Sequence, residues 1–251
     1  APAVKLAEDG VVLSAASART IAAAFASFPP HARAIYGRED RARAAGERLV
    51  QKDLARSLRL VQAQGAAAVY GGRLGQAIDQ AMRQAGGFLA MKDLEADRAE
   101  WWTTIRIPYR DVEIVTAAPP ANAFDFLVRL GMMSRFDLAA LGHNTAPFLH
   151  RFAEVTKHGF WVRLRYAGDP EITPPPLQTL LSERYWTEQV ARLDMARASG
   201  FTYPDAAPAR HTTHFVVADR WGNVVSATQT LGNSFGSRIM PEGTGIWLNN
   251  S

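Results

Sequence analysis

Apolar residues recur at helical spacing in several stretches of the first 200 residues. Within residues 49–64, Leu54, Leu58 and Val61 are spaced so that they share one face of a helix, and a glycine follows that is typical of a helix end. Similar patterns predict further helices over residues 17–28, 74–84, 91–94, 121–130, 146–166 and 178–197. Ser17 is the expected N-cap of the first of these, because its hydroxyl can accept a hydrogen bond from a free backbone N–H.

Other stretches alternate apolar and polar residues with the period of a β-strand. Residues 103–107 and 112–116 flank a short polar turn, which predicts one β-hairpin. Residues 213–218 and 224–231 predict a second hairpin, with Gly222 in its turn where a positive φ angle is needed.

The sequence therefore predicts an α+β chain that is mostly helical up to a linker and then forms a β-hairpin. Residues 200–209 are rich in proline and alanine, and we expect them to form that linker, exposed and flexible. A hairpin cannot form a domain alone, because its two faces need other elements to cover them. We therefore expect the 251 residues to be part of a longer protein.

Composition excludes several classes of function. The chain has no cysteine, which rules out disulfides, thiolate metal ligands and a cysteine nucleophile. Its net charge is +4, but the basic residues do not cluster and no nucleic-acid-binding module occurs, so no nucleic-acid partner is expected. No apolar run reaches the roughly 18 residues of a membrane helix, so we expect a soluble protein, cytoplasmic or periplasmic, with no membrane partner.

Two threonines, Thr212 and Thr213, stand where the linker meets the second hairpin. Most threonines at the start of a strand only support the strand, which they favour. A threonine hydroxyl is also a weak nucleophile, and it needs an adjacent base to react. Cleavage of the backbone just before Thr212 would supply that base, because the freed α-amine has a pKa of about 8 and is partly neutral near physiological pH.

The chain from Thr212 onward carries a series of short runs in a fixed order. They are Thr212-Thr213-His214-Phe215, Asp219, Gly222-Asn223-Val224-Val225-Ser226, Thr228-Gln229-Thr230-Leu231, Phe235-Gly236 and Gly245-Ile246-Trp247-Leu248-Asn249-Asn250. These runs resemble the start of the small subunit of γ-glutamyltransferases. Residues 4–10, 54–58, 86–94, 109–110, 118–120 and 168–170 are similar to motifs of the large subunit, so the resemblance covers nearly the whole chain.

The resemblance implies a fold and a subunit arrangement. The fold would be the αββα sandwich of the N-terminal nucleophile hydrolases, only partly covered by this chain. Residues 1–211 would be the C-terminal part of the large subunit and residues 212–251 the start of the small subunit. Such a zymogen would become a heterodimer by autocatalytic cleavage between His211 and Thr212. Whether two heterodimers then associate into a dimer is left open. The resemblance implies neither a cofactor nor a metal.

The resemblance also implies the roles of four residues near the junction. Thr212 would attack the carbonyl of His211 to release itself, and it would then attack a substrate amide to form an acyl-enzyme. Water or an acceptor amine would resolve that intermediate. Thr230 matches the threonine whose hydroxyl holds the oxygen of the nucleophile in place. His214 matches a motif position, and we expect it to be a partly buried structural residue, because the freed amine already serves as the base.

Three positions bear on the substrate. Gly232 stands where γ-glutamyltransferases have a substrate-binding asparagine, and Asn233 lies one step later. Ser251 stands where they have a glutamine. A site that lacks the polar partners of a charged substrate loses specificity for that substrate. These candidate substrate-binding residues therefore indicate another small amide at least as strongly as a γ-glutamyl amide. The fold family also includes cephalosporin acylases, capsule depolymerases and oxamate amidohydrolases, which makes an oxamate-like amide or the side chain of a β-lactam an alternative substrate.

Two further alternatives belong to other classes of protein. The chain could come from an uncleaved, inactive relative that serves as a binding or structural module. Its six histidines could bind a metal, but their spacing matches no metal-binding motif. The carboxylate-binding arginine and the oxyanion hole that the resemblance implies would lie before Ala1 and after Ser251.

Overall fold

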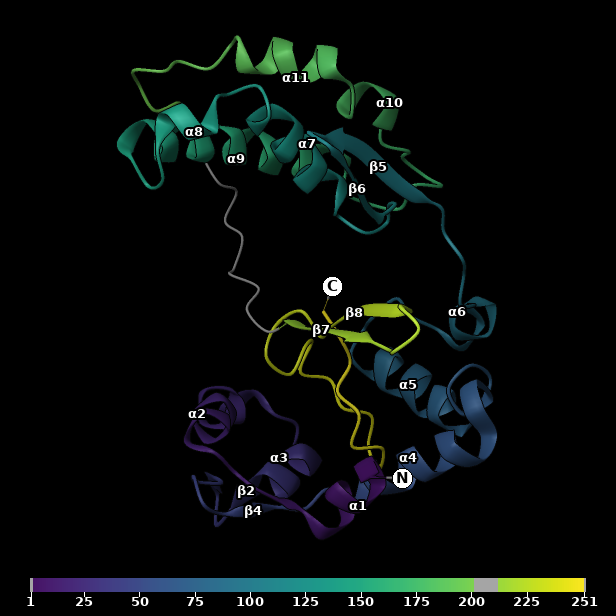
Figure 1. Cartoon of the computed structure of the whole chain (residues 1–251). Coiled ribbons are helices and arrows are strands. Elements are labelled where there is room, and N and C mark those ends of the chain that lie inside the picture. Colours follow the sequence, from purple (N-terminus) through teal and green to yellow (C-terminus); the bar gives the residue numbers. More distant parts are fainter. Residues whose placement is uncertain (1, 201–211, 251) are drawn as a thin grey trace. The chain divides into compact units, whose positions relative to one another are not determined.

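The chain divides into two compact units (Figure 1). Unit 1 comprises Ala1–Arg98 and Ala207–Ser251, and unit 2 comprises Ala99–Ala206. The computed structural model describes residues 2–200 and 212–250. The predicted linker from residue 201 onward, His211 and Ser251 therefore lie outside the described residues.

Unit 1 contains mostly short helices. They are α1 (Pro2–Asp9), α2 (Ala15–Ala24), α3 (Pro30–Tyr36), α4 (Lys52–Gln64), α5 (Arg73–Gln84) and α6 (Met91–Ala96), with 3-10 turns η1 (Phe25–Ser27) and η2 (Gly65–Ala68). Ser17, the expected N-cap of the helix predicted over residues 17–28, was wrong. The hydroxyl of Ser14 accepts the N–H of Ser17 at 3.1 Å, so α2 begins three residues earlier and ends before the 3-10 turn.

Helix α4 forms where the sequence predicts it, but its buried residues are two small ones on or beside the predicted apolar face. Ala55 and Ser57 are buried, whereas Val61 is 39% exposed. Ser57 is buried by a tertiary contact, since its hydroxyl donates a hydrogen bond of 2.7 Å to the carbonyl of Thr244. The helix therefore turns its small residues toward the segment that follows the second hairpin.

Four strands of two residues each were not predicted from the sequence. They are β1 (Val11–Val12), β2 (Gly37–Arg38), β3 (Arg41–Ala42) and β4 (Arg48–Leu49). β1 pairs with β4 and β2 pairs with β3, both antiparallel. Two residues carry no readable alternation, which is why the pattern of polar and apolar positions misses them.

An aromatic cluster forms the core of unit 1. Phe28 is 1% exposed, and its ring centroid lies 5.6 Å from that of Tyr36, 4.7 Å from that of Phe235 and 4.8 Å from that of Trp247. The indole N–H of Trp247 also donates to the hydroxyl of Tyr36 at 3.1 Å. The segment after the second hairpin is thus built into the core made by the first 50 residues.

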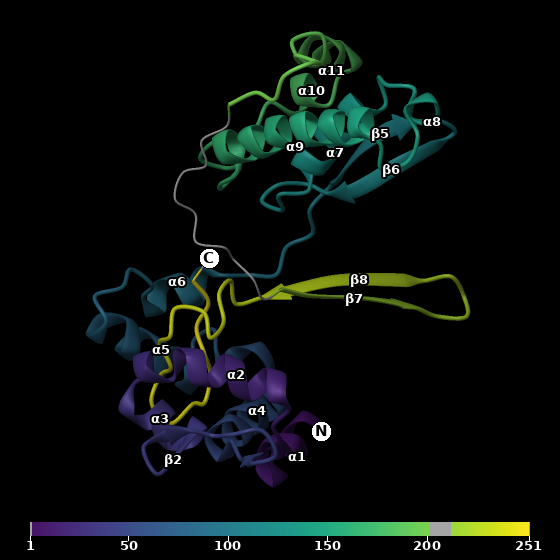
Figure 2. The same ribbon diagram turned by 90° about the vertical axis from the view of Figure 1, so that its left-hand side faces the viewer.

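The second predicted hairpin is confirmed. β7 (Thr212–Ala218) pairs antiparallel with β8 (Val224–Thr230), and Gly222 in the turn has φ +85°. The carboxylate of Asp219 accepts the backbone N–H groups of Trp221 and Asn223, each at 2.9 Å. The side-chain amide of Asn223 is the largest cause that lowers the pKa of Asp219. Figure 2 shows the two strands running together away from the helices of unit 1.

Unit 2 packs helices against the first predicted hairpin, which is also confirmed. Its elements are β5 (Thr104–Tyr109), β6 (Val112–Ala117), α7 (Phe124–Met133), α8 (Leu138–Leu141), α9 (Ala146–Tyr166), α10 (Leu177–Leu180) and α11 (Glu183–Val190). α7 is central, since it packs against α9, α11 and β5. Its buried residues Leu127, Val128 and Met132 meet Val155 of α9 and Trp186 of α11 in one apolar core.

The single helix predicted over residues 178–197 was wrong. The hydroxyl of Ser182 accepts the N–H of Tyr185 at 3.2 Å and starts a new helix, α11. The indole N–H of Trp186 donates to the carbonyl of Leu180 at 2.9 Å, which holds α10 and α11 in a tight turn. After Val190 the chain continues in turns.

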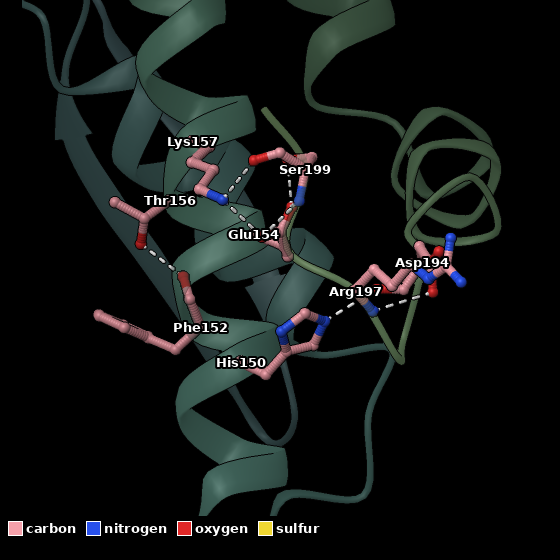
Figure 3. Close-up of polar contacts among 8 residues, drawn as sticks. All are labelled: His150, Phe152, Glu154, Thr156, Lys157, Asp194, Arg197 and Ser199. Atoms are coloured by element: carbon pink, nitrogen blue, oxygen red, sulfur yellow. Dashed lines mark hydrogen bonds and ion pairs between the residues drawn. The ribbon is translucent and has the colours of Figure 1, made fainter. Parts of the chain in front are cut away.

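The last described stretch of unit 2 runs along one face of α9 (Figure 3). The ring of His150 lies 2.8 Å from the carbonyl of Asp194, and the buried carboxylate of Glu154 accepts the N–H and the hydroxyl of Ser199. Lys157 donates to the same carboxylate at 2.6 Å. Burial raises the pKa of Glu154, but the hydrogen bonds from Lys157 and Ser199 outweigh it, so the pKa lies below its ordinary value.

The strands in the described residues form four two-stranded antiparallel sheets, so the chain is α+β as expected. Within residues 2–200 and 212–250, no helix is long and apolar enough to cross a membrane.

Candidate active site

The candidate nucleophile lies at the first position of β7. Thr212 is directly opposite Thr230, the last residue of β8, and its hydroxyl donates a hydrogen bond of 3.1 Å to the hydroxyl of Thr230. Short β-branched side chains suit this arrangement, because opposite residues of an antiparallel pair lie close and their χ1 angles are restricted. The structure thus brings together the two residues that the sequence singled out as catalytic.

A backbone group fixes Thr230 from the other side. The N–H of Gly232 donates to the hydroxyl oxygen of Thr230 at 2.9 Å. Gly232 has φ +81°, a left-handed conformation in which glycine is favoured because it has no Cβ. The chain therefore turns immediately after β8, and the turn helps to hold the hydroxyl that receives the Thr212 hydrogen bond.

His214 shares a face of the hairpin with Thr212, since alternate residues of a strand point to the same side. Its Nδ1 lies 2.8 Å from the hydroxyl oxygen of Thr228, and its Nε2 lies 3.4 Å from that of Ser226. Both partners lie on β8. These contacts suit the structural role expected for His214, because the ring connects the two strands through their side chains. The expected partial burial was wrong, since His214 is exposed on the hairpin.

Two of the three candidate substrate-binding residues lie in the turn after β8. Asn233 directly follows Gly232, and its backbone N–H donates to the side-chain oxygen Oδ1 of Asn250 at 2.9 Å. The third, Ser251, lies outside the described residues, as does His211 of the junction. Asn250 belongs to the last of the runs that carry the family resemblance, and no individual role was expected for it. The only signal in the sequence was the unusual glycine at 232, which leaves room beside the turn for the side chain of another residue.

A hollow of about 380 Å³ borders Thr230. It is lined by Thr213, Gln229, Thr230, Leu231, Asn233, Ser234 and Phe235. A larger hollow of about 660 Å³ lies at Phe25 and α3, and contains none of the candidate residues. The smaller hollow is the one associated with the threonine pair, because Thr230 lines it.

Among the residues that the structure describes, no group of three or more histidine, aspartate or glutamate side chains could hold a metal ion.

The geometry defines a class of protein in which a strand-initial threonine is held by a second threonine. The whole chain, residues 1–251, matches the family model described as gamma-glutamyltranspeptidase, and the chain belongs to this family. It is 37% identical to an acylase ACY 1 proenzyme of Pseudomonas sp. (strain V22) over 82% of this chain and 37% of that protein. It is 31% identical to a glutathione hydrolase proenzyme of Pseudomonas sp. (strain A14) over 99% of this chain and 44% of that protein.

The chain is also similar to the crystal structure of a cephalosporin acylase from Bacillus halodurans. The TM-score is 0.86 at 25% identity, and the match covers 100% of this chain and 47% of that chain. This likeness confirms the predicted fold class, an α+β chain that covers part of an N-terminal nucleophile hydrolase. The chain spans less than half the length of these curated relatives.

Proposed function

We propose that this chain carries the self-cleavage junction of an amide hydrolase or acyltransferase, with Thr212 as its nucleophile. The observation that carries the proposal is the hydrogen bond of 3.1 Å from the Thr212 hydroxyl to the Thr230 hydroxyl. Family membership supports it, and so do the relatives named as proenzymes. The boundary between residues 1–211 and 212–251 follows from the same proposal, because it is the bond that would be cut.

Self-cleavage is an acyl shift followed by hydrolysis. The Oγ1 atom of Thr212 attacks the carbonyl carbon of His211 and forms an ester as the peptide C–N bond breaks. The hydroxyl proton ends on the nitrogen of Thr212, which becomes an α-amine. Water then hydrolyses the ester, so that residue 211 ends in a carboxylate and Thr212 regains its hydroxyl. Thr230 contributes by fixing the rotamer of Thr212 before the attack.

Turnover uses the same hydroxyl with the new amine as its base. The amine takes the hydroxyl proton as Oγ1 attacks the substrate amide, and the proton then passes to the leaving nitrogen. Water or an acceptor amine attacks the acyl-enzyme and restores Thr212. No cofactor takes part in these steps.

The packing of unit 1 supports a heterodimer after cleavage. The aromatic cluster joins Phe28 and Tyr36, which precede the junction, to Phe235 and Trp247, which follow it. Ser57 and Thr244 form a buried hydrogen bond between the same two parts. A cut before Thr212 would therefore leave the two fragments held by a shared core.

For the acyl group, we propose a small amide other than a γ-glutamyl compound, such as an oxamate-like amide or the acyl side chain of a β-lactam. Gly232 gives the site no side chain where the γ-glutamyltransferase pattern has an asparagine. The relatives named as acylases support the same branch. A γ-glutamyl amide is the second candidate, supported by the similarity to a glutathione hydrolase proenzyme.

The test uses the full-length protein that contains this chain. It should give two fragments on a denaturing gel, with the smaller one beginning at Thr212, and Thr212→Ala should stay intact. Turnover of a γ-glutamyl anilide, oxamate and an acylated β-lactam then identifies the acyl group. Two fragments with the same terminus in Thr212→Ala would refute the nucleophile. Intact wild-type protein without turnover of any of the three amides would favour an inactive binding or structural relative.

A further inference from the structure

Asn250 holds the turn after β8 at two points. Its side-chain Oδ1 accepts the backbone N–H of Asn233 at 2.9 Å, and its own backbone N–H donates to the carbonyl of Leu231 at 3.1 Å. These partners flank Gly232 on both sides. A residue seventeen positions away in the chain therefore fixes the short segment that follows the second catalytic threonine.

The glycine at 232 is what makes room for this contact. A Cβ atom built on Gly232 would lie 2.2 Å from Oδ1 of Asn250, closer than real Cβ atoms come to a non-bonded heavy atom. The φ angle of +81° also disfavours a side chain at this position. The side chain of Asn250 thus occupies the space that Gly232, which has no side chain, leaves empty.

The turn connects this pair to the nucleophile. The N–H of Gly232 donates to the Thr230 hydroxyl at 2.9 Å, and the same oxygen accepts the Thr212 hydroxyl at 3.1 Å. If the turn moves, the N–H of Gly232 moves with it, and the oxygen that orients Thr212 loses a fixed partner. The contact of Asn250 with the turn therefore acts on Thr212 through Thr230.

We propose that Asn250 is a positioning residue for the reaction at Thr212, which it supports by holding the 231–233 turn. The inference rests on the proposed function, because its catalytic consequence needs Thr212 to be the nucleophile. The glycine at position 232 leaves the Asn250 side chain the room to support the backbone next to Thr230.

The test compares two nearly isosteric variants of the full-length protein. Asn250→Leu removes the acceptor for the Asn233 N–H, whereas Asn250→Asp keeps an oxygen there. We expect Asn250→Leu to slow self-cleavage and kcat by roughly three- to tenfold with KM within about twofold, the range for losing one hydrogen bond. Asn250→Asp should restore most of both rates at neutral pH. The matched control is Asn223→Leu, which removes a side-chain hydrogen bond at the far end of the hairpin and should leave both rates unchanged.

Hydrogen exchange of the backbone separates this inference from the proposed function. In Asn250→Leu the amides of residues 232 and 233 should exchange faster than in the wild type, and in Asn223→Leu they should not. Gly232→Ala provides a second route, since it displaces the Asn250 side chain instead of removing it, and it should reproduce the defect. Unchanged exchange in Asn250→Leu, or rates in Asn250→Asp as low as in Asn250→Leu, would overturn the inference. A wild type that neither cleaves itself nor turns over any amide would instead overturn the proposed function.

Discussion

The hydroxyl of Thr212 donates to the hydroxyl of Thr230 across the β7–β8 pair, with 3.1 Å between the two oxygens. Both residues belong to the backbone ladder, so the contact needs no long side chain to be ordered. The turn after β8 adds the N–H of Gly232 to the same acceptor. The orientation of Thr212 is therefore set mainly by backbone geometry, and few rotatable bonds separate the strand register from its hydroxyl oxygen.

Thr230→Val should weaken the reaction at Thr212 without unfolding the hairpin. Valine keeps the β-branched shape that strands favour but removes the acceptor oxygen. A hydrogen bond of this kind is worth about 1 to 1.5 kcal/mol, which corresponds to roughly tenfold slower self-cleavage and turnover. The measurement is the rate at which fragments appear on a denaturing gel. Thr116→Val, a strand threonine of β6 in unit 2, is the control and should cleave normally; equal rates in all three proteins would contradict the role of Thr230.

Glu154→Gln should destabilise unit 2 in a way that depends on pH. The buried carboxylate is held by Lys157 and Ser199, and its pKa is lowered (Figure 3). A lowered pKa means that the stabilisation is complete above the ordinary glutamate pKa of about 4.3 and is lost as pH falls through the lower folded value. We expect a loss of about 1 to 3 kcal/mol at pH 7, which shrinks as the pH is lowered below about 4.

Urea unfolding of the wild type and Glu154→Gln at pH 7 and at low pH measures this difference. The matched control is Glu188→Gln, because Glu188 pairs with an exposed arginine on α11 and surface pairs contribute little. It should change stability by less than about 0.5 kcal/mol at either pH. A gap between Glu154→Gln and wild type that is constant with pH would show that the charge of Glu154 is not what stabilises Ser199.

Local sequence patterns predicted the elements that local interactions determine. Both hairpins and the helices from Lys52 and Ala146 form close to where they were expected, because alternation, helical spacing and turn glycines act over a few residues. The helix over residues 178–197 was wrong because Ser182 competes locally as an N-cap. Residues of a helix-like pattern can begin a second helix wherever such a cap becomes available.

The contacts missed by the sequence join residues that are distant in the chain. Ser57 is buried because it meets Thr244, and no pattern around residue 57 indicates a partner so far away. The Thr212 and Thr230 pair was expected only through a family resemblance, and the structure supplies its geometry. The contact between Asn250 and the turn at Gly232 needed the fold itself, since the glycine at 232 does not indicate which distant residue fills the space beside it.

Gly131→Ala should destabilise unit 2 although alanine favours helices. A Cβ atom at 131 would lie 2.2 Å from the ring of Trp186, which is 1% exposed and tied by its indole N–H. Overpacking against a rigid ring costs about 1 to 3 kcal/mol, more than the gain of about 1 kcal/mol from helix propensity. Thermal unfolding measures the change.

Gly159→Ala is the comparison for this prediction, since Gly159 lies within helix α9 and also faces a side chain. That side chain belongs to Arg129, which is partly exposed and can rotate away, although it would weaken its ion pair with Asp125. We expect a net change within about 1 kcal/mol, because the helix gain offsets part of the cost. A smaller loss for Gly131→Ala than for Gly159→Ala would mean that Trp186 yields more easily than Arg129.

Phe28→Ala should loosen the proposed heterodimer more than it affects the reaction at Thr212. The ring is 1% exposed and contacts Phe235 and Trp247, which belong to the other side of the proposed cut. Removing a buried phenylalanine costs about 3 to 5 kcal/mol. In the cleaved protein this loss falls on the core shared by the two fragments, so they should separate at a lower urea concentration, as measured by sedimentation. Phe88→Ala is the matched control, because Phe88 is 99% exposed and its loss should leave the separation unchanged. If the Phe28→Ala fragments stay together at the same urea concentration as the wild type, the aromatic cluster is not what joins them.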